Sequence, residues 1–467
     1  MGYPIRDSPF NSIIIMITKK TAILFFHVIL FLFNSVYSQN KVVGYYPDWI
    51  KYTLPLNQIK FENLTHIVHA FAWPSSTGEI SMYEGMPNTN LISAVHNAGR
   101  KILIAIGGAG QSTGFASISA DSIKRSIFID NTFNLVSANG FDGVDLDWEF
   151  PADINEGKNQ TILFKELRKR FDQIDTSLLI TMAVSAGSYF GQYCEYEKLS
   201  PFVNWFSMMG YDFHGSWTAH AAHNAPLYQP SNCTDGADDN GIRYLTSTRK
   251  IPKEKLLLGV PFYGKEFNSA GLYQTRTGSV TDLLYSEIAS RRSNGNWEYF
   301  WDDFSKVPYL LDTAHSKFVT FDDTTSIRLK CEYALNNNLS GIMIWALGQD
   351  LTGSSQPLLE TIGKSLDLVT SINSVQEIIV TDFYLFNNYP NPFNSSTVIK
   401  FGIPEAGLVT LTVYDLLGRE VEKLADKNMA AGIYSIDFNA SNLSGGVYFY
   451  TLKAGEFFQT KKMIYLK

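Results

Sequence analysis

Between Lys41 and Leu366 the sequence repeats one unit, a short apolar run followed by a stretch with helical spacing. Strands joined by helices in this way run parallel in one sheet, because each helix returns the chain to the start of the next strand. Eight units predict an α/β fold, the (β/α)8 or TIM barrel, whose functional side chains lie at the carboxyl ends of the strands. The expected strands are Val42 to Tyr46, His66 to Phe71, Ile102 to Ile106, Gly143 to Glu149, Leu179 to Val184, Trp205 to Met209, Leu256 to Pro261 and Gly341 to Trp345. The clearest expected helices are Asn90 to Ala98, Ile123 to Asn139, Gln160 to Ile174 and Ser326 to Asn337.

The fourth expected strand carries three carboxylates, Asp145, Asp147 and Glu149, at alternate positions. Alternate side chains of a strand share a face, so the acids point one way and the apolar residues between them point the other. When carboxylates lie this close in an apolar setting, the pKa of at least one of them rises, which keeps that acid protonated near neutral pH. The pattern indicates acid–base chemistry. The alternatives are a solvent-facing acidic edge strand and a hard-cation site with oxygen ligands.

The string DGVDLDWE, from Asp142 to Glu149, resembles the DGxDxDxE signature of the family 18 glycoside hydrolases, the chitinases and their relatives. The resemblance implies that the 2-acetamido group of the sugar attacks, in place of a second carboxylate. It also implies that Glu149 protonates the leaving oxygen and that Asp147 orients the acetamido N–H group. Asp145 would share a hydrogen bond with Asp147, and Asp142 would support the end of the strand.

Other strings resemble the same family. Met209-Gly210-Tyr211-Asp212 resembles its MxYD motif, and Gly107-Gly108 resembles its SxGG motif, although Ala105 stands where serine is usual. The resemblance implies that Tyr211 binds the acetamido carbonyl, that Asp212 contacts the sugar or Glu149, and that Trp345 forms the floor beneath the reacting sugar. The expected catalytic residues are Glu149, Asp147, Asp145 and Tyr211. The expected substrate-binding residues are Trp345, Asp212, Met209, Trp217, Tyr45, Phe71 and Gly108.

The repeat is interrupted once, after Gly264, where the gap before the eighth strand is too long for a single helix. Residues from about Lys265 to Phe318 contain strand-like pieces and an expected helix from Val280 to Arg292. We expect a small α+β insertion, about residues 265–318. Chitinase-type family members often carry one here, and it forms one wall of a deep groove that favours long polymers.

Some positions differ from the family pattern or suggest other chemistry. Lys265 stands where arginine is common, and Thr218 stands where aspartate is common, so substrate contacts there stay open. His220 and His223 share a loop, but two histidines without a third ligand are a weak zinc signal. The string that begins at His223 resembles a structural loop of the family. We therefore expect neither a metal nor an organic cofactor.

Residues 1–38 have the layout of a secretory signal peptide, with Lys19 and Lys20, an apolar run from Ala22 to Phe33, and cleavage expected after Ser38. A retained membrane anchor is the alternative. Export permits disulfides. Cys331 is expected as a buried thiol on a helix, whereas Cys194 and Cys233 follow strands at the same barrel end and are the pair that could form a bridge.

A second domain follows the barrel domain, residues 39–366, after a linker at residues 367–380. Residues 381–467 contain short alternating strands between turns rich in Gly, Pro and Asn, which predicts an all-β, immunoglobulin-like sandwich. The expected strands are Ser396 to Ile403, Leu408 to Asp415, Gly432 to Asn439, Gly446 to Ala454 and Phe457 to Tyr465. The strings YPNPFN, VYDLLGREV and GGVYFYTLKAGEF resemble the C-terminal sorting domain of the type IX secretion system. A carbohydrate-binding or fibronectin-like module is the alternative.

The 467 residues are 45% hydrophobic with a net charge of −7 and no basic run, which does not favour nucleic acid or an anionic membrane as partner. The sequence and its resemblances thus predict a monomeric chitinase that is secreted or displayed on the surface of a Gram-negative bacterium. The expected partners are chitin or chitooligosaccharides and the type IX secretion machinery. One alternative is an endo-β-N-acetylglucosaminidase acting on N-glycans or peptidoglycan. A chitin-binding lectin is the other, although the acid Glu149 favours an enzyme.

Overall fold

The computed structural model describes residues 40–230, 235–370, 383–388 and 390–467. The chain divides into two compact units, of which the first ends at Thr370 and the second begins at Ser371. The expected signal peptide lies outside the described residues, as do residues 371–380 of the expected linker. The linker was predicted to start at residue 367, but residues 367–370 belong to the helix α11 (Pro357–Thr370). None of the helices in the described part of the chain is long and apolar enough to cross a membrane.

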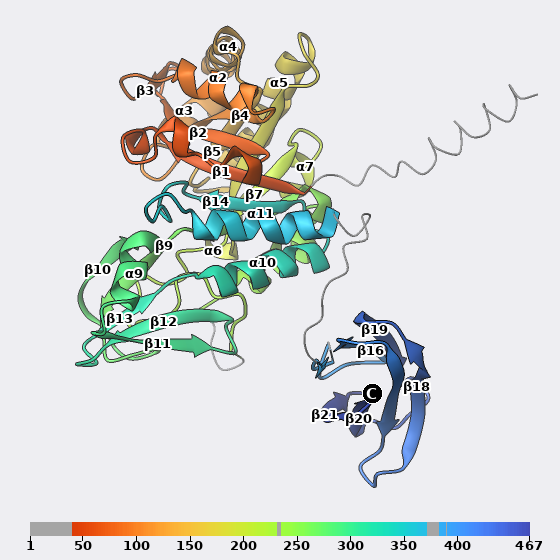
Figure 1. The fold of residues 1–467 in the computed structure, drawn as a ribbon. Coiled ribbons are helices and arrows are strands. Elements are labelled where there is room, and N and C mark those ends of the chain that lie inside the picture. The colour runs from red at the N-terminus through yellow and green to blue at the C-terminus, as the bar shows by residue number, and fades with distance from the viewer. Residues whose placement is uncertain (1–39, 231–234, 371–382, 389) are drawn as a thin grey trace, which may run out of the picture. The chain divides into compact units, whose positions relative to one another are not determined.

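Eight parallel strands form a closed barrel in the first unit (Figure 1). Their order is β1-β14-β8-β7-β6-β5-β4-β2, and β1 also pairs with β2, which closes the sheet. The short strand β3 (Ile80–Met82) extends β2 antiparallel. The barrel strands are β1 (Lys41–Pro47), β2 (His66–Pro74), β4 (Lys101–Gly107), β5 (Gly143–Asp147), β6 (Leu179–Ser185), β7 (Trp205–Met209), β8 (Leu256–Pro261) and β14 (Gly341–Trp345). The predicted barrel is confirmed.

Helices separate most of these strands, and side-chain caps define where several begin. The Asp121 carboxylate accepts from two free N–H groups of α4, and the helix stops at Gly140, whose φ of +75° suits glycine. The helix α5 begins earlier than predicted, because Asp153 caps it. The helices of the barrel are α2 (Thr89–Asn97), α3 (Gly114–Ala120), α4 (Ser122–Asn139), α5 (Ile154–Asp172), α6 (Ser188–Gly191), α7 (Tyr196–Leu199), α8 (Asp238–Arg243), α10 (Thr324–Asn336) and α11 (Pro357–Thr370).

The strand β5 shows how the barrel separates its two faces. Val144, Leu146 and Trp148 belong to the large hydrophobic core that includes residues of α4 and α5. The alternate residues Asp145 and Asp147 are buried on the other face. Val68 and Leu103 lie in a separate apolar cluster built from residues of barrel strands. The alternation predicted from the sequence therefore turns the acids inward and the apolar side chains toward the helices.

The insertion after β8 is a five-stranded antiparallel sheet in the order β10-β9-β13-β12-β11, with one helix. The predicted helix from Val280 is wrong in its first half, because Val280 to Leu284 belong to β10 and pair with β9. The helix α9 starts only at Tyr285, where the Glu287 carboxylate accepts from the Leu284 N–H at 2.8 Å. The elements are β9 (Tyr263–Asn268), β10 (Thr277–Leu284), α9 (Tyr285–Arg292), β11 (Trp297–Asp302), β12 (Val307–Asp312) and β13 (Lys317–Thr320).

The second unit contains two antiparallel sheets around its own core, which includes Phe401, Leu411 and Tyr450. One sheet has the order β15-β16-β19 and the other β18-β17-β20-β21. The prediction missed β15 and β18. The strands of the second unit are β15 (Tyr384–Leu385), β16 (Ser396–Ile403), β17 (Gly407–Tyr414), β18 (Glu420–Met429), β19 (Gly432–Asn439), β20 (Gly446–Ala454) and β21 (Phe457–Tyr465).

The cysteines give no support for the bridge considered above. Cys194 and Cys331 are buried free thiols, and burial raises the pKa of Cys194 to about 11. Cys233 lies outside the described residues. Cys331, on α10, packs in the barrel core as predicted.

Candidate active site

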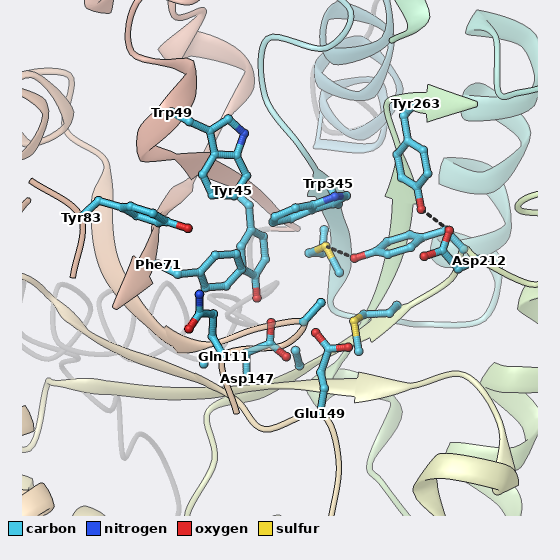
Figure 2. Close-up of a pocket in the computed structure, with 16 residues that line it drawn as sticks. Tyr45, Trp49, Phe71, Tyr83, Gln111, Asp147, Glu149, Asp212, Tyr263 and Trp345 are labelled. Atoms are coloured by element: carbon cyan, nitrogen blue, oxygen red, sulfur yellow. Dashed lines mark hydrogen bonds between the residues drawn. The ribbon is translucent and has the colours of Figure 1, made fainter. Parts of the chain in front are cut away.

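The acids of β5 converge on one pocket at the carboxyl end of the barrel strands. The prediction extended β5 to Glu149, but the strand ends at Asp147, so Glu149 lies on the loop directly after it. Figure 2 shows the carboxyl groups of Asp147 and Glu149 turned toward the same cavity, and both residues line it. Asp142, just before the strand, accepts from the Ile102 N–H at 2.8 Å, in the supporting role predicted for it.

Asp145 lies deeper than the other two acids and is only 1% exposed. Its two oxygens accept hydrogen bonds from the hydroxyl groups of Tyr45, at 2.7 Å, and Thr181, at 2.5 Å. Burial raises the pKa of Asp145, and these two hydrogen bonds oppose the rise. The predicted hydrogen bond between Asp145 and Asp147 does not form in the structure, because Asp145 is held by Tyr45 and Thr181 instead.

Asp147 has a different environment. It is buried, and its Oδ1 atom has no hydrogen-bond partner among the described residues. Burial raises the pKa of Asp147 well above its ordinary value, and the charges of Glu149 and Asp145 raise it further. Both effects favour the neutral form of Asp147, and one of its oxygens is unpaired in the pocket wall.

Glu149 has the pKa that a general acid requires. Burial is the larger cause and the negative charge of Asp212 the second, and together they raise the pKa of Glu149 to about 7. Its backbone N–H donates to Ser112 Oγ at 3.1 Å, and the same Oγ lies 2.9 Å from the Asp147 carbonyl oxygen. Ser112 thus fixes the turn that carries the acid, and a substantial fraction of Glu149 is protonated at neutral pH.

Two glycines allow β4 and β5 to approach closely at this end of the barrel. Gly107 has a φ of +116°, and a Cβ atom there would lie 2.1 Å from the Asp147 carbonyl oxygen. At Gly108 a Cβ atom would meet the Phe71 ring at 2.9 Å. Gly107 lines the pocket, whereas the predicted contact residue Gly108 supports Phe71 from behind. Ala105, at the usual serine position, is buried and pairs in register with Asp145.

Aromatic side chains form one side of the pocket (Figure 2). The ring of Trp345 lies 5.7 Å from those of both Tyr45 and Phe71, and 6.5 Å from that of Trp49. These rings come from the ends of β14, β1 and β2 and from the segment after β1. Flat apolar faces of this kind suit the C–H face of a pyranose ring.

Polar groups lie across from the aromatic side. Tyr211 and Met209 line the pocket, and burial raises the pKa of the Tyr211 phenol well above its ordinary value. Asp212 Oδ1 accepts from the Tyr263 hydroxyl at 2.5 Å and lies 3.0 Å from Lys265 Nζ. Lys265, at the usual arginine position, therefore pairs with a residue that lines the pocket.

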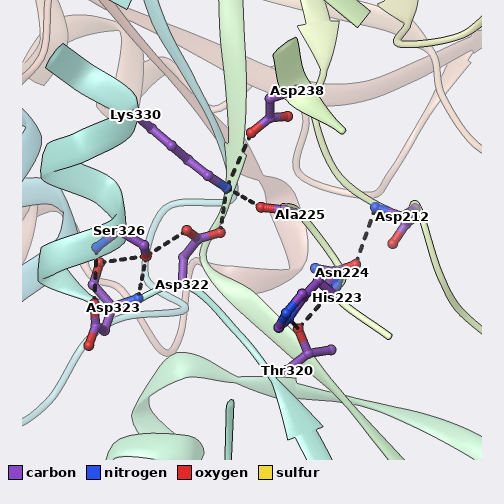
Figure 3. A network of polar contacts seen from close by, with 10 residues as sticks. All are labelled: Asp212, His223, Asn224, Ala225, Asp238, Thr320, Asp322, Asp323, Ser326 and Lys330. Atoms are coloured by element: carbon purple, nitrogen blue, oxygen red, sulfur yellow. Dashed lines mark hydrogen bonds and ion pairs between the residues drawn. The ribbon is translucent and has the colours of Figure 1, made fainter. Parts of the chain in front are cut away.

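A buried network holds the loop that positions Asp212 (Figure 3). The Asp212 N–H donates to Asn224 Oδ1 at 3.2 Å, and the Asn224 N–H donates to Thr320 Oγ1 at 3.0 Å. The fully buried Lys330 of α10 donates to the Ala225 carbonyl at 2.6 Å and to Asp322 at 2.8 Å. The loop at His223 is therefore structural, as its resemblance implied, and it connects the barrel to the insertion.

Most of the predicted residues come together here, and some lining residues were missed. Asp145, Gly108 and Trp217 do not line the pocket, and of these Trp217 is 61% exposed. Its ring instead lies 5.5 Å from Lys265 Nζ. The pocket residues that the sequence did not suggest are Trp49, Tyr83, Gly107, Ala109, Gln111, Ala183, Tyr263 and Met343. In the described part of the chain, the one group spaced to hold a metal ion is His214, His220 and Asp235, and none of the three lines this pocket.

Comparison with known families agrees with this geometry. The family model described as glycosyl hydrolases family 18 matches residues 41–350, which include the barrel strands, the insertion and the pocket. The chain belongs to glycosyl hydrolase family 18. As a family 18 member, it also carries a secretion system C-terminal sorting domain, which matches residues 387–466.

Individual relatives cover most of the barrel unit. Chitinase A1 of Niallia circulans is 27% identical over 504 residues, covering 89% of this chain and 70% of that protein. A probable endochitinase of Caenorhabditis elegans is 28% identical, and the match covers 69% of this chain and 59% of that protein. The solved structure of Ostrinia furnacalis Group IV chitinase in complex with allosamidin has a TM-score of 0.65 and 28% identity, covering 70% of this chain and 99% of that one.

Proposed function

We propose that this family 18 member is a secreted chitinase that hydrolyses β-1,4 linkages between N-acetylglucosamine units with retention of configuration. The acetamido group of the substrate would act as the nucleophile. The observation that carries the proposal is the state of the pocket carboxyl groups. Glu149 has a pKa of about 7, which suits a general acid, whereas the neutral form of Asp147 is favoured and Asp212 is engaged by Tyr263 and Lys265.

Three carboxyl groups line the pocket, Asp147, Glu149 and Asp212. Burial and neighbouring charge favour the neutral form of Asp147, and a neutral carboxyl group is a poor nucleophile. Asp212 is engaged by Tyr263 and Lys265. A retaining hydrolysis then requires a nucleophile from the substrate, and the 2-acetamido oxygen is the group that can close a five-membered ring on the anomeric carbon.

In the proposed mechanism, Glu149 protonates the leaving oxygen while the acetamido oxygen attacks. The unpaired Oδ1 of Asp147 would accept the acetamido N–H, and the partial negative charge of this oxygen would stabilise the positive charge that develops on the oxazolinium ring. The Tyr211 hydroxyl, which remains protonated, would donate to the acetamido group. Glu149, now deprotonated, would then activate the water that opens the ring.

Substrate binding is assigned to the aromatic side of the pocket. Trp345 would stack beneath the reacting sugar, with Tyr45, Phe71 and Trp49 beside it. Asp212 and Met209 would contact the sugar from the opposite side. Trp217 is too exposed to contact the reacting sugar and would serve a unit farther along a polymer.

The experiment compares two chitin oligosaccharides that differ only at the reacting sugar. A fully N-acetylated oligomer should be cleaved with the β-anomer appearing first, whereas an oligomer with a free amine at that sugar should bind without cleavage there. A thiazoline analogue of the intermediate should inhibit, and Asp147→Asn should weaken both turnover and this inhibition. Initial α-anomers, or clean cleavage at deacetylated sugars, would show that a carboxylate or an activated water is the nucleophile.

The variant Glu149→Gln separates an enzyme from a chitin-binding lectin. An amide cannot protonate the leaving oxygen, so turnover should fall by about 10²- to 10⁴-fold or more while the chain still folds and binds oligosaccharide. If wild type and variant had equally low turnover but bound chitin oligosaccharides tightly, the protein would be a chitin-binding lectin and not an enzyme. Turnover on an N-glycan but not on chitin oligosaccharides would favour an endo-β-N-acetylglucosaminidase.

We also propose that the sorting domain directs export by the type IX secretion machinery, which gives a released or cell-surface enzyme. The match of the second unit to secretion sorting domains supports this address. In a bacterium with that machinery, the full chain should reach the medium or the surface. The same chain without residues 383–467 should stay inside the cell envelope.

A further inference from the structure

Three potential metal ligands converge on the loop that follows β7, outside the pocket described above. His214 is buried, His220 is partly exposed, and Asp235 is exposed at the surface end of the group. Asp235 Oδ2 lies 3.1 Å from His214 Nε2 and 3.0 Å from His220 Nε2. The three ligand atoms lie within 4.8 Å of one another.

The hydrogen bonding of His214 leaves one of its two ring nitrogens available as a ligand. His214 is 2% exposed, and its Nδ1 lies 2.8 Å from the His223 carbonyl oxygen, which places the proton on Nδ1. In the neutral ring Nε2 then carries a lone pair, and this lone pair faces a carboxylate. Nε2 is buried, and its 3.1 Å contact with Asp235 Oδ2 does not have the geometry of a hydrogen bond. A backbone carbonyl on Nδ1 with Nε2 left as the donor atom is the arrangement that metal-bound histidines adopt.

We propose that His214, His220 and Asp235 bind a Zn²⁺ ion. Two imidazole nitrogens and one carboxylate oxygen are ligands that zinc prefers, and three protein ligands leave a fourth position for water. Zinc–ligand bonds of about 2.0–2.1 Å in a tetrahedron place neighbouring ligand atoms roughly 3.3 Å apart. The two nitrogen–oxygen distances in the structure, 3.1 and 3.0 Å, are close to that spacing.

His223, considered above as a possible ligand, does not belong to the site. Its Nε2 lies 2.9 Å from Asp302, and its contribution is the carbonyl oxygen that orients His214. The sequence suggested His220 but not the other two ligands, His214 and Asp235. Asp235 follows His220 by fifteen residues.

The site lies where the loop meets the insertion. His220 forms an isolated bridge with Thr275, and the Ala221 N–H donates to the Gln274 carbonyl at 2.9 Å. His214 follows Asp212 by two residues in the chain. A zinc ion here would fasten the segment that carries Asp212 and Trp217, and it would act on the shape of the groove wall without touching the reacting atoms.

The test is a titration of the full chain, first treated with a chelator, with ZnCl₂ followed by isothermal calorimetry. We expect one site per chain. His220→Gln and Asp235→Asn should each weaken zinc binding by at least about 100-fold, since even second-shell partners of metal ligands change affinity by about 10–100-fold. His315→Gln is the matched control, because His315 is exposed and has one carboxylate neighbour, Glu298, at 3.8 Å. It should bind zinc as the wild type does.

Both ligand variants alter side chains that are not buried, so they should fold, which circular dichroism would check. A second measurement on the wild type alone uses Co²⁺, whose visible absorption is intense in a tetrahedral site and weak in water. Intense absorption that excess Zn²⁺ removes supports the site. Absence of saturable zinc binding in the wild type, or equal binding by wild type and both ligand variants, would overturn the proposal.

Discussion

The variant Asp212→Asn tests whether the charge of Asp212 sets the working pH of Glu149, the proposed general acid. After burial, the negative charge of Asp212 is the second cause of the raised pKa of Glu149. Removing a negative charge stabilises the charged form of Glu149 and lowers its pKa. A general acid must be protonated, so kcat/KM of the wild type should fall as the pH rises through about 7. In Asp212→Asn that fall should occur at a lower pH.

The structure limits the size of the effect. The pKa of Glu149 rises from 4.5 to about 7, a difference that corresponds to roughly 3 kcal/mol between the two protonation states. Burial is the larger cause, so Asp212 contributes less than half of the rise. The basic limb of the pH profile should therefore move down by about one pH unit at most. The Lys265 ammonium, 3.0 Å from Asp212, loses a partner in the variant and acts in the same direction.

The assay is kcat/KM against pH with a fluorogenic chitobioside, because this parameter reports the pKa values of the free enzyme. The position of the limb is the readout, since Asp212→Asn should also reduce the rate at every pH. Asp282→Asn is the control, because Asp282 pairs with the same Lys265 at 2.8 Å but does not contribute to the pKa of Glu149. A limb that stays in place, or moves to higher pH, in Asp212→Asn would refute this explanation of the acid.

Three further outcomes are expected. Tyr45→Phe leaves a buried oxygen of Asp145 without its donor and should lower the free energy of unfolding by about 1–3 kcal/mol, measured in urea; an unchanged unfolding midpoint would contradict this. Lys330→Met should cost about 3–5 kcal/mol in the same measurement, because Asp322 and Asp238 stay buried without their cation, whereas Lys306→Met, at an exposed pair, should cost less than about 1 kcal/mol. A chain ending at Thr370 should remain soluble with wild-type kcat, because the cores of the two units share no residue. An insoluble or inactive product would show that the barrel needs the second unit.

The barrel was predictable because most of its strands are short, largely apolar runs, and the acid face of β5 was predictable from alternation alone. The strand β18 was not, because its sequence EVEKLADKNM is mostly exposed and lacks an apolar period. The first half of the predicted helix at Val280 failed for a related reason. Most of β10 is exposed, so pairing with β9 determines its conformation.

The site was predictable only where a motif marked it. Glu149, Asp147 and Tyr211 lie in strings with recognisable spacing, and the structure places all three in the pocket. Trp49, Tyr83 and Gln111 lie on loops after strands, where no periodicity distinguishes a lining residue from any other surface side chain. The hydrogen bond from the Tyr45 hydroxyl to Asp145 joins residues a hundred positions apart, and only the closed barrel brings them together.

The closure of the barrel also determines when activity can first appear. The strand β1 pairs with β2 on one side and with β14 on the other, so the sheet keeps two open edges until the last barrel strand is in place. The pocket depends on the same step, because the ring of Tyr45 on β1 packs against that of Trp345 on β14. A growing chain therefore contains its acid long before it contains a place to bind a sugar. Hydrolysis should therefore begin only when the barrel closes, and the time at which turnover appears reports when folding of the barrel is complete.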